Sequence, residues 1–380
     1  MEVLFQGFLY LSLQAVIMMG VGGVLILLAV KKDYEPMLLL PIGFGAILVN
    51  LPFAAVWEFE GAKGVLQIFY NAGILTEIFP VLIFVAVGAM IDFSVLIKSP
   101  KMLFLGAAAQ FGIFATVVVV ILLGDIFPQL EIDLMSAAAI GILGTADGPT
   151  SIFVASRFAP HLLGPIAVAA YSYMALVPII QPPVIKALTT EEERRIRMDF
   201  SNKTVSKTAL IMFPIVVTVI AGILAPVAVP LVGLLMFGNL IRVSGVLERL
   251  SQSAQNELAN LVTLLLGITI GSTMHYERFL QPLTLIVLAL GLVAFIFDTA
   301  GGVVFVKVLN LFSKNKINPM VGAAGISAFP MSARLVQKMA AEEDPTNFIL
   351  MPAVSANVAG QLASAIAGGM VLAIVPWLLG

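Results

Sequence analysis

The sequence contains no cysteine and few charged residues. Among its 380 residues only 11% are charged, whereas a soluble domain has roughly 25%. Without cysteine the chain has no disulfide, no thiolate metal site and no cysteine nucleophile. Its two histidines, His161 and His275, stand far apart in the sequence, which argues against a histidine metal site or catalytic triad. The net charge of −2 leaves no basic excess for binding nucleic acid.

Apolar residues dominate the chain. They make up 60% of it, and the mean hydropathy is +1.06. Several apolar runs exceed the ~20 residues that a helix needs to cross a bilayer, so we predict an all-α, multi-pass membrane protein. Residues 1–7 contain Glu-Val-Leu-Phe-Gln-Gly. That string resembles a viral 3C-type protease cleavage site left from expression, and it is excluded from the fold argument. About ten spans are expected, over residues 8–30, 37–53, 79–97, 102–123, 162–188, 209–226, 227–241, 259–274, 282–309 and 347–379.

The distribution of Lys and Arg predicts how these spans are oriented, because short loops rich in both residues stay in the cytoplasm. Lys31 and Lys32 end the first span, and the most charged loop of the chain lies at 189–208. Both segments are therefore predicted to be cytoplasmic. The N-terminus and the C-terminus are then both predicted to lie in the periplasm, with the chain in a bacterial inner membrane.

Two apolar stretches are interrupted by Gly and Pro, which do not hold a regular helix. The first stretch, 134–157, contains Gly144-Thr-Ala-Asp-Gly-Pro-Thr-Ser151, and the second, 317–338, contains Gly325 and Pro330. With the orientation above, the first stretch enters and returns from outside, and the second from the cytoplasm. We therefore predict two re-entrant hairpins of opposite orientation.

The two halves of the chain share a set of residues in the same order, at an offset of about 180 residues. The matched sets are Pro41, Asn50, Gly88, Gly144, Pro149 and Ser151 in the first half, and Pro230, Asn239, Gly267, Gly325, Pro330 and Ser332 in the second. They predict a helical bundle of two inverted-topology repeats, over 37–188 and 226–380. An N-terminal span, 8–36, precedes them, and the charged loop 189–208 and a connecting span, 209–225, separate them. Folds of this kind bind ions near the bilayer midplane, where broken helices of both halves meet.

Asp147, in the break of the first hairpin, is the first candidate site residue. A carboxylate inside a membrane costs at least ~3 kcal/mol on insertion scales, so such a residue usually has a function. Free backbone carbonyls and the hydroxyls of Thr145, Thr150 and Ser151 would form an all-oxygen site for a hard cation. The alternative is a carboxylate that only caps the N-terminus of a half-helix.

Five further polar or small residues follow in the second half of repeat one and in the second hairpin: Tyr173, Asn318, Gly322, Ser327 and Arg334. Tyr173 either ligates a cation or passes a proton, or it packs with its hydroxyl bonded to backbone. Asn318 and Ser327 offer neutral oxygens, and Gly322 permits close backbone approach, although Asn318 is also a suitable cap. Arg334 either holds an anionic carboxyl group or follows only the positive-inside rule.

The last span and two other segments hold the remaining candidates. Asn357 and Ser364 are predicted to lie opposite the Tyr173 region, as ligands or as small residues that permit close helix packing. Asp298 is a second acidic residue inside a span, and it either binds a second ion or bonds to a neighbouring helix. The charged run 191–197 is predicted to be mainly a solvated loop, with docking of a soluble partner as the alternative.

Six strings carry a resemblance to a known family: Ala146-Asp-Gly-Pro-Thr150, Asn357-Val-Ala-Gly360, and the segments 35–45, 106–116, 169–178 and 313–319. With them the chain resembles the beta subunits of sodium-translocating, biotin-dependent decarboxylases, which act on oxaloacetate, methylmalonyl-CoA or glutaconyl-CoA. The resemblance covers nearly the whole chain after residue 8. Asp-Thr-Ala-Gly-Gly at 298–302 looks more like the acyl-CoA members than the oxaloacetate ones.

The resemblance implies a division of labour. A soluble carboxyltransferase alpha subunit moves carboxylate onto biotin, which a biotin carrier protein holds. The beta subunit then releases CO2 from carboxybiotin, consumes a periplasmic proton and exports Na+. A small gamma or delta membrane subunit and a homo-oligomer, such as a trimer, are further expected partners. By the resemblance the catalytic residues are Asp147, Tyr173 and Arg334, with Arg334 at carboxybiotin, and the Na+ ligands are Asp147, Asn318, Gly322, Ser327 and Asn357.

The residues alone leave a second function open. A secondary transporter, such as a Na+/carboxylate symporter or a Na+/H+ antiporter, would use the same inverted-repeat architecture in an elevator mechanism and would need no biotin. A purely structural anchor for a soluble enzyme fits poorly, because it does not explain an acidic residue in a Gly/Pro hairpin.

Overall fold

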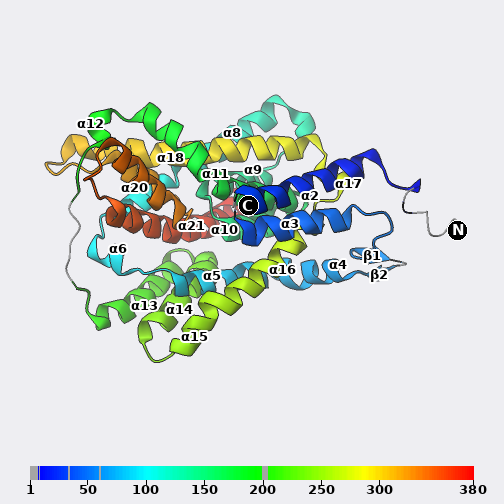
Figure 1. The fold of residues 1–380 in the computed structure, drawn as a ribbon, viewed down its shortest axis with the longest axis horizontal. Helices are drawn as coiled ribbons and strands as arrows, with labels where there is room; N and C mark the ends of the chain where they lie inside the picture. The colour runs from blue at the N-terminus through cyan, green and yellow to red at the C-terminus, as the bar shows by residue number, and fades with distance from the viewer. Residues whose placement is uncertain (1–6, 8, 33–34, 60, 199–203) are drawn as a thin grey trace.

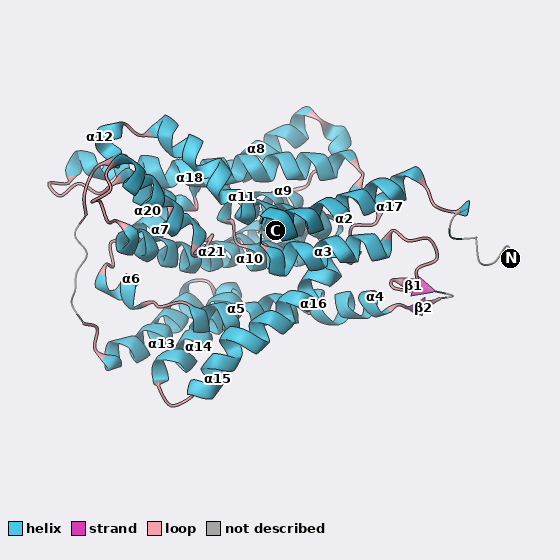
Figure 2. Ribbon diagram, in the orientation of Figure 1, coloured by secondary structure: helices cyan, strands magenta, loops and turns pink. Residues whose placement is uncertain are grey.

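The computed structural model describes residues 7, 9–32, 35–59, 61–198 and 204–380. Apart from one short antiparallel hairpin, in which β1 (Glu58–Phe59) pairs with β2 (Ala62–Lys63), the regular structure of these residues is helical (Figure 2). The first half contains α2 (Leu13–Lys32), α3 (Pro36–Val49), α4 (Val65–Phe69), the π-helical turn η1 (Tyr70–Ile74), α5 (Ile78–Met90), α6 (Ser94–Lys98), α7 (Met102–Ala109), α8 (Phe111–Ile126), η2 (Pro128–Leu130), α9 (Leu134–Gly141), η3 (Ile142–Thr145), α10 (Gly148–Phe158), η4 (Pro160–Leu162) and α11 (Leu163–Leu188).

The second half is also helical (Figure 1). It contains α12 (Glu191–Arg194), α13 (Lys207–Leu224), η5 (Pro226–Ala228), α14 (Val229–Ser244), α15 (Glu248–Ser253), the π-helical turn η6 (Ala254–Leu258), α16 (Ala259–Ser272), α17 (Tyr276–Phe279), α18 (Pro282–Phe312), α19 (Pro319–Ala323), α20 (Met331–Glu343) and α21 (Leu350–Leu379).

Five helical segments of the described chain are long and apolar enough to cross a bilayer, or up to seven if each of two bent pairs is one span. The protein is therefore an all-α, multi-pass membrane protein, as its composition predicts. The count is lower than the predicted ten because the other predicted ranges fall on shorter or bent helices, α3, α5, α11, α13 and α16. The five segments are Leu13–Lys32, Met102–Ile126, Pro226–Ser244, Pro282–Phe312 and Leu350–Leu379.

In two places a helix of the first half packs closely on a helix of the second half, with glycine at the contact. Helix α3 packs on α16, and α14 packs on α5. A Cβ at Gly45 would lie 2.4 Å from the carbonyl oxygen of Ile268, and one at Gly238 would lie 2.0 Å from that of Val85. Only glycine lets the backbones approach this closely, as in other small-residue helix interfaces of membrane proteins. Each pair thus joins a helix of the first half to a helix of the second half.

Two asparagines that the sequence matching pairs make equivalent contacts at these crossings. The amide nitrogen of Asn50 donates to the carbonyl of Met274 at 2.9 Å, at the end of α16. The amide nitrogen of Asn239 donates to the carbonyl of Ile91 at 3.0 Å, at the end of α5. Each asparagine satisfies a carbonyl that a helix end leaves free. Such contacts agree with the proposed internal repeat, which stays a prediction.

Both predicted hairpin stretches consist of a helix, a break and a second helix. The first is α9, η3 and α10, and the second is α19 and α20. Their breaks touch, because the carbonyl of Thr145 accepts from the backbone N–H of Ser327 at 3.1 Å and from its hydroxyl at 2.7 Å. Helices α9, α10, α11 and α21 lie near the middle of the view in Figure 1. Whether the stretches re-enter the membrane stays a prediction.

The charged segment 189–198, here called the strap, is more than a solvated loop. The Arg194 guanidinium, 13% exposed, pairs with Glu343 at 2.5 Å. Arg197 pairs with Asp344 at 2.8 Å, and hydrogen bonds from Thr346 and Arg197 lower the pKa of Asp344 to about 2. The strap is thereby tied to the end of α20. The prediction of a mainly solvated loop was wrong for Arg194, whereas Arg197 stays exposed. It failed because the partner of Arg194 lies about 150 residues later in the chain.

Candidate functional site

Asp147 lies in the break between η3 and α10, where local sequence places it. Ala146 adopts a left-handed conformation with a φ of 50° and ends the turn, and Pro149 pre-sets the first turn of α10. Asp147 is the N-cap of α10, a position that favours Asp. The break holds it well inside the molecule, where it is only 3% exposed.

Neutral donors surround the Asp147 carboxylate. Its Oδ2 accepts from the hydroxyl of Thr150 at 2.7 Å, from the hydroxyl of Ser364 at 2.6 Å and from the amide of Gln361 at 3.1 Å. No Lys, Arg or His forms an ion pair with it in the described part of the chain. A serine or threonine hydroxyl that donates to a carboxylate also carries lone pairs that can face a cation after rotation. The site can therefore hold a proton or a hard cation.

Helix α21 supplies most of the remaining polar groups from one face. Asn357, Gln361 and Ser364 follow a spacing of four and three residues, which places them side by side on a helix. The Asn357 amide donates to the carbonyl of Ile326 in the second break at 2.6 Å. Its Oδ1 is buried and makes no hydrogen bond within the described residues. Ser327, Asn357 and Asp147 thus gather where the two breaks meet, and a free oxygen is available there.

The structure gives Tyr171, rather than Tyr173, the place next to Asp147. The Tyr173 hydroxyl donates to the carbonyl of Leu288 on α18, and its ring packs on Gly291. Residues two apart on a helix face different sides, so the Tyr171 ring packs instead on Gly148, where a Cβ would lie 2.1 Å from its Cε1 atom. The Tyr171 hydroxyl is buried without a hydrogen-bond partner among the described residues.

Arg334 lies on α20 and is exposed, away from the carboxylate of Asp147. With Pro178, Pro182, Lys186, Lys338 and others it lines an open cavity of about 500 Å³. Three basic side chains and one acidic one, Glu342, line this cavity. Such a lining attracts an anionic group, and the guanidinium of an arginine matches a carboxylate with two parallel hydrogen bonds.

Comparison with known proteins shows to which family the chain belongs. A family model described as the Na+-transporting oxaloacetate decarboxylase beta subunit matches residues 14–375. The glutaconyl-CoA decarboxylase subunit beta of Acidaminococcus fermentans is 50% identical over 97% of this chain and 96% of its own. The methylmalonyl-CoA decarboxylase subunit beta of Propionigenium modestum is 49% identical, with 97% and 96% covered. The oxaloacetate decarboxylase beta chain of Haemophilus ducreyi is 46% identical, with 97% of each chain covered.

The chain belongs to the family of Na+-transporting decarboxylase beta subunits. The matched segment contains both breaks, the Arg334 cavity and most of the last helix. It begins at residue 14, so residues 1–13 lie outside it. The resemblance seen in the sequence is thereby confirmed at the level of the family.

Two of the predicted Na+ ligands, Asn318 and Gly322, do not contact Asp147 in this structure. The Asn318 amide donates to the carbonyls of Arg194 and Ile196 at 2.8 and 2.9 Å, and its Oδ1 accepts from the N–H of Met320 at 3.0 Å. Gly322 packs on α18, where its Cβ would lie 2.1 Å from the carbonyl oxygen of Gly302. In this structure both residues hold the second break in position. Their role as Na+ ligands stays a prediction.

The sequence-based prediction does not include Gln361 and Tyr171, two neighbours of Asp147. It leaves Ser364 either as a ligand or as a small residue that permits close helix packing. A signal existed for Gln361, because it lies four residues after Asn357 and so on the same helix face. For Tyr171 the sequence held no signal, since the rotation of α11 decides which tyrosine faces the break.

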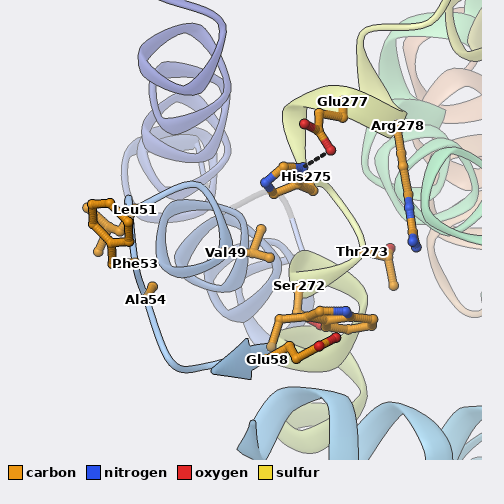
Figure 3. A pocket seen from close by; sticks show the side chains of 11 residues that line it. Val49, Leu51, Phe53, Ala54, Glu58, Ser272, Thr273, His275, Glu277 and Arg278 are labelled. Atoms are coloured by element: carbon orange, nitrogen blue, oxygen red, sulfur yellow. Dashed lines mark ion pairs between the residues drawn. The ribbon is translucent and has the colours of Figure 1, made fainter. Parts of the chain in front are cut away.

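A second cavity lies far from the Arg334 cavity, near α17, which Figure 1 places at the opposite end of the molecule from α20. It measures about 410 Å³ and is lined at the ends of α3 and α16 and by Glu58, His275, Glu277 and Arg278 (Figure 3). His275 and Glu277 lie 3.7 Å apart, and burial lowers the pKa of His275. The beta subunit therefore has a polar cavity at each end.

Proposed function

We propose that this chain is the membrane subunit of a primary sodium pump. It decarboxylates carboxybiotin, consumes a periplasmic proton and exports Na+ across a bacterial inner membrane. The observation that supports this most directly is the Asp147 carboxylate, buried without a cationic partner at the meeting point of two helix breaks. The decarboxylation step is proposed because the relatives are named as decarboxylase beta subunits.

Sodium would bind at Asp147, with oxygens of the two breaks and of α21 as further ligands. Thr150 and Ser364 already touch the carboxylate, and the free Oδ1 of Asn357 lies on the same helix face as Ser364. Ser327 would join them from the second break. Na+ prefers oxygen ligands of this kind. A proton and Na+ compete for the same carboxylate, which couples proton uptake to sodium release.

Carboxybiotin would enter the Arg334 cavity. Arg334, Lys186 and Lys338 would hold its carboxylate, and the carrier domain would remain in water outside. Decarboxylation breaks the bond between the ureido nitrogen and the carboxyl carbon, releases CO2 and leaves a nitrogen that takes up one proton. Tyr173, whose hydroxyl donates to the carbonyl of Leu288 on α18, would relay that proton.

Sodium export requires the Asp147 site to open alternately to the two sides. We infer that the part with the two breaks moves against the crossed pairs α3–α16 and α5–α14 in an elevator motion. The strap ties α19 and α20 to the end of α11, so it would move with the breaks. The expected partners are a soluble carboxyltransferase alpha subunit, a biotin carrier protein, a small gamma or delta membrane subunit and further copies of the chain, for example in a trimer.

The test is carboxybiotin decarboxylation by the purified complex, with and without Na+, for the wild type and Asp147→Asn. We expect Na+ to stimulate CO2 release in the wild type and to have no effect in the variant, because the amide cannot balance the charge of the ion. Asp125→Asn serves as the matched control, since Asp125 is exposed at the end of α8. A sodium response that survives in Asp147→Asn would refute the proposed site.

The second candidate is a secondary Na+/carboxylate symporter or Na+/H+ antiporter. The Asp147 site favours it equally, because nothing in its geometry requires biotin. Co-purification separates the two functions. A biotinylated protein that elutes with the chain and is detected with streptavidin supports the pump, whereas Na+ transport by the chain alone supports the secondary transporter.

A further inference from the structure

Asp298 is a second buried carboxylate, and the function proposed above does not use it. It lies in the middle of α18, the longest helix given above, and is completely buried. Neither of its carboxylate oxygens makes a hydrogen bond within the described residues. None of the ion pairs found in that part of the chain includes it. Backbone N–H groups of the neighbouring helix α8, at Gly112 and Ile113, face it instead.

Two glycines make room for this carboxylate. A Cβ at Gly112 would lie 2.2 Å from Oδ1, and a Cβ at Gly144 would lie 2.7 Å from Oδ2. Gly112 belongs to the first turn of α8, after the interruption at Gln110 that separates α7 from α8. Gly144 belongs to η3, which leads into Asp147. The Asp298 carboxylate thus lies between the α7–α8 break and the break that holds the proposed sodium site.

The surroundings of Asp298 suit a proton better than a metal ion. The backbone N–H groups of Gly112 and Ile113 face the carboxylate, and such donors repel a cation. The oxygens are packed directly on glycine, so the oxygen ligands that Na+ requires have no space beside them. A proton needs none. An ionised carboxylate without a partner is very unfavourable in an apolar interior, so the group becomes neutral instead.

The titratable groups near this part of α18 are few. Tyr173 on α11 is engaged with Leu288, and Asp147 follows η3. Lys186 on α11, Asp125 on α8 and Lys307 on α18 lie toward the exposed or half-exposed ends of their helices. No basic side chain on these elements therefore compensates an ionised Asp298.

We propose that Asp298 is a proton-binding site, separate from Asp147, that holds one proton in the arrangement seen here. The proton comes from solvent water and forms one O–H bond at the carboxylate. If the first turn of α8 rotated so that its N–H groups pointed straight at the carboxylate oxygens, they would favour the charged form, as they do for anions at helix N-termini. A small movement of the break would thus release the proton.

Asp298 is placed to sense the sodium site. Gly144 precedes Asp147 by three residues, so their Cα atoms are at most about 11 Å apart. Any shift of η3 when an ion binds at Asp147 would change the packing around Asp298. This coupling rests on the proposed function, because it requires an ion at Asp147, whereas the protonation of Asp298 does not.

Infrared spectroscopy of the full-length chain in lipid vesicles tests the protonation directly. The sample is Asp147→Asn with a heavy-carbon label on aspartate carboxyls, at neutral pH and without Na+. Exposed aspartates are ionised there. We expect a carboxylic acid carbonyl band that shifts with the label and in deuterated water, and that is lost in Asp147→Asn/Asp298→Asn. Asparagine has the shape of the protonated acid, so the double variant should fold.

Each result has one meaning. Absence of the band in Asp147→Asn overturns the proposal, and no folded double variant is needed for that conclusion. A band that disappears when Na+ is added to Asp147→Asn also overturns it, because Asp298 would then be a second sodium site. A band that persists while Na+ fails to stimulate decarboxylation in the wild type supports the proton site and refutes the pump.

Discussion

At the scale of single residues, the site depends on a carboxylate whose partners are all neutral. Ser364, Thr150 and Gln361 donate to Asp147, and a buried hydrogen bond to a charged group is worth about 1.5–3 kcal/mol. These donors hold the carboxylate in place without neutralising it. The charge is therefore left for an ion or a proton, which is what a coupled transport site needs.

Ser364→Ala should weaken sodium binding without unfolding the chain. Loss of one oxygen at the carboxylate should raise the Na+ concentration for half-maximal decarboxylation by about tenfold or more. The matched control is Ser355→Ala on the same helix, because the Ser355 hydroxyl is also buried but donates to the carbonyl of Val95 at 3.0 Å. Equal sodium dependence in the two variants would contradict a role of Ser364 at the site.

At the scale of elements, two features organise the molecule around the site. The crossed pairs α3–α16 and α5–α14 meet through glycine with almost no space between backbones. The strap connects the outer ends of α19 and α20 to the end of α11 through Asn318 and Arg194. The first feature makes a rigid frame, and the second makes the broken helices move as one unit in the proposed mechanism.

Gly238→Ala should destabilise the frame. The new methyl group would lie 2.0 Å from the Val85 carbonyl, which is backbone and cannot move aside, and overpacking of this kind costs about 1–3 kcal/mol. Thermal unfolding in detergent would show a lowered Tm. In the control, Gly233→Ala on the same helix, the nearest atom to the Cβ is 3.5 Å away. This control should keep or slightly raise the Tm, since Ala favours helix.

At the scale of the whole molecule, basic residues and polar cavities occupy both ends of an apolar body. The Arg334 cavity and the strap lie at one end, and the cavity with His275 and Glu277 lies at the other. The positive-inside rule assigns the strap to the cytoplasm. Carboxybiotin, which a soluble carrier brings, would then reach Arg334 from that side.

The absence of cysteine makes this orientation easy to test. Single substitutions Glu192→Cys in the strap and Gln129→Cys in η2 introduce one thiol each at exposed positions. A thiol reagent that cannot cross membranes should label Gln129→Cys in intact spheroplasts and Glu192→Cys only in inverted vesicles. The opposite pattern would reverse the predicted topology and place the Arg334 cavity outside.

By itself, the sequence determined the class, the breaks and the central acid of this protein. Hydropathy, Gly and Pro spacing and the N-cap preference of Asp act over a few residues, so they placed Asp147 in a helix break without knowledge of the fold. Only the tertiary structure decided what surrounds it. Gln361 and Ser364 lie more than 200 residues after Asp147 in the chain. The rotation of α11 places Tyr171, and not Tyr173, beside Asp147. Asn318 is hydrogen-bonded to the strap. These outcomes depend on how distant helices pack and turn against each other, which no local pattern encodes.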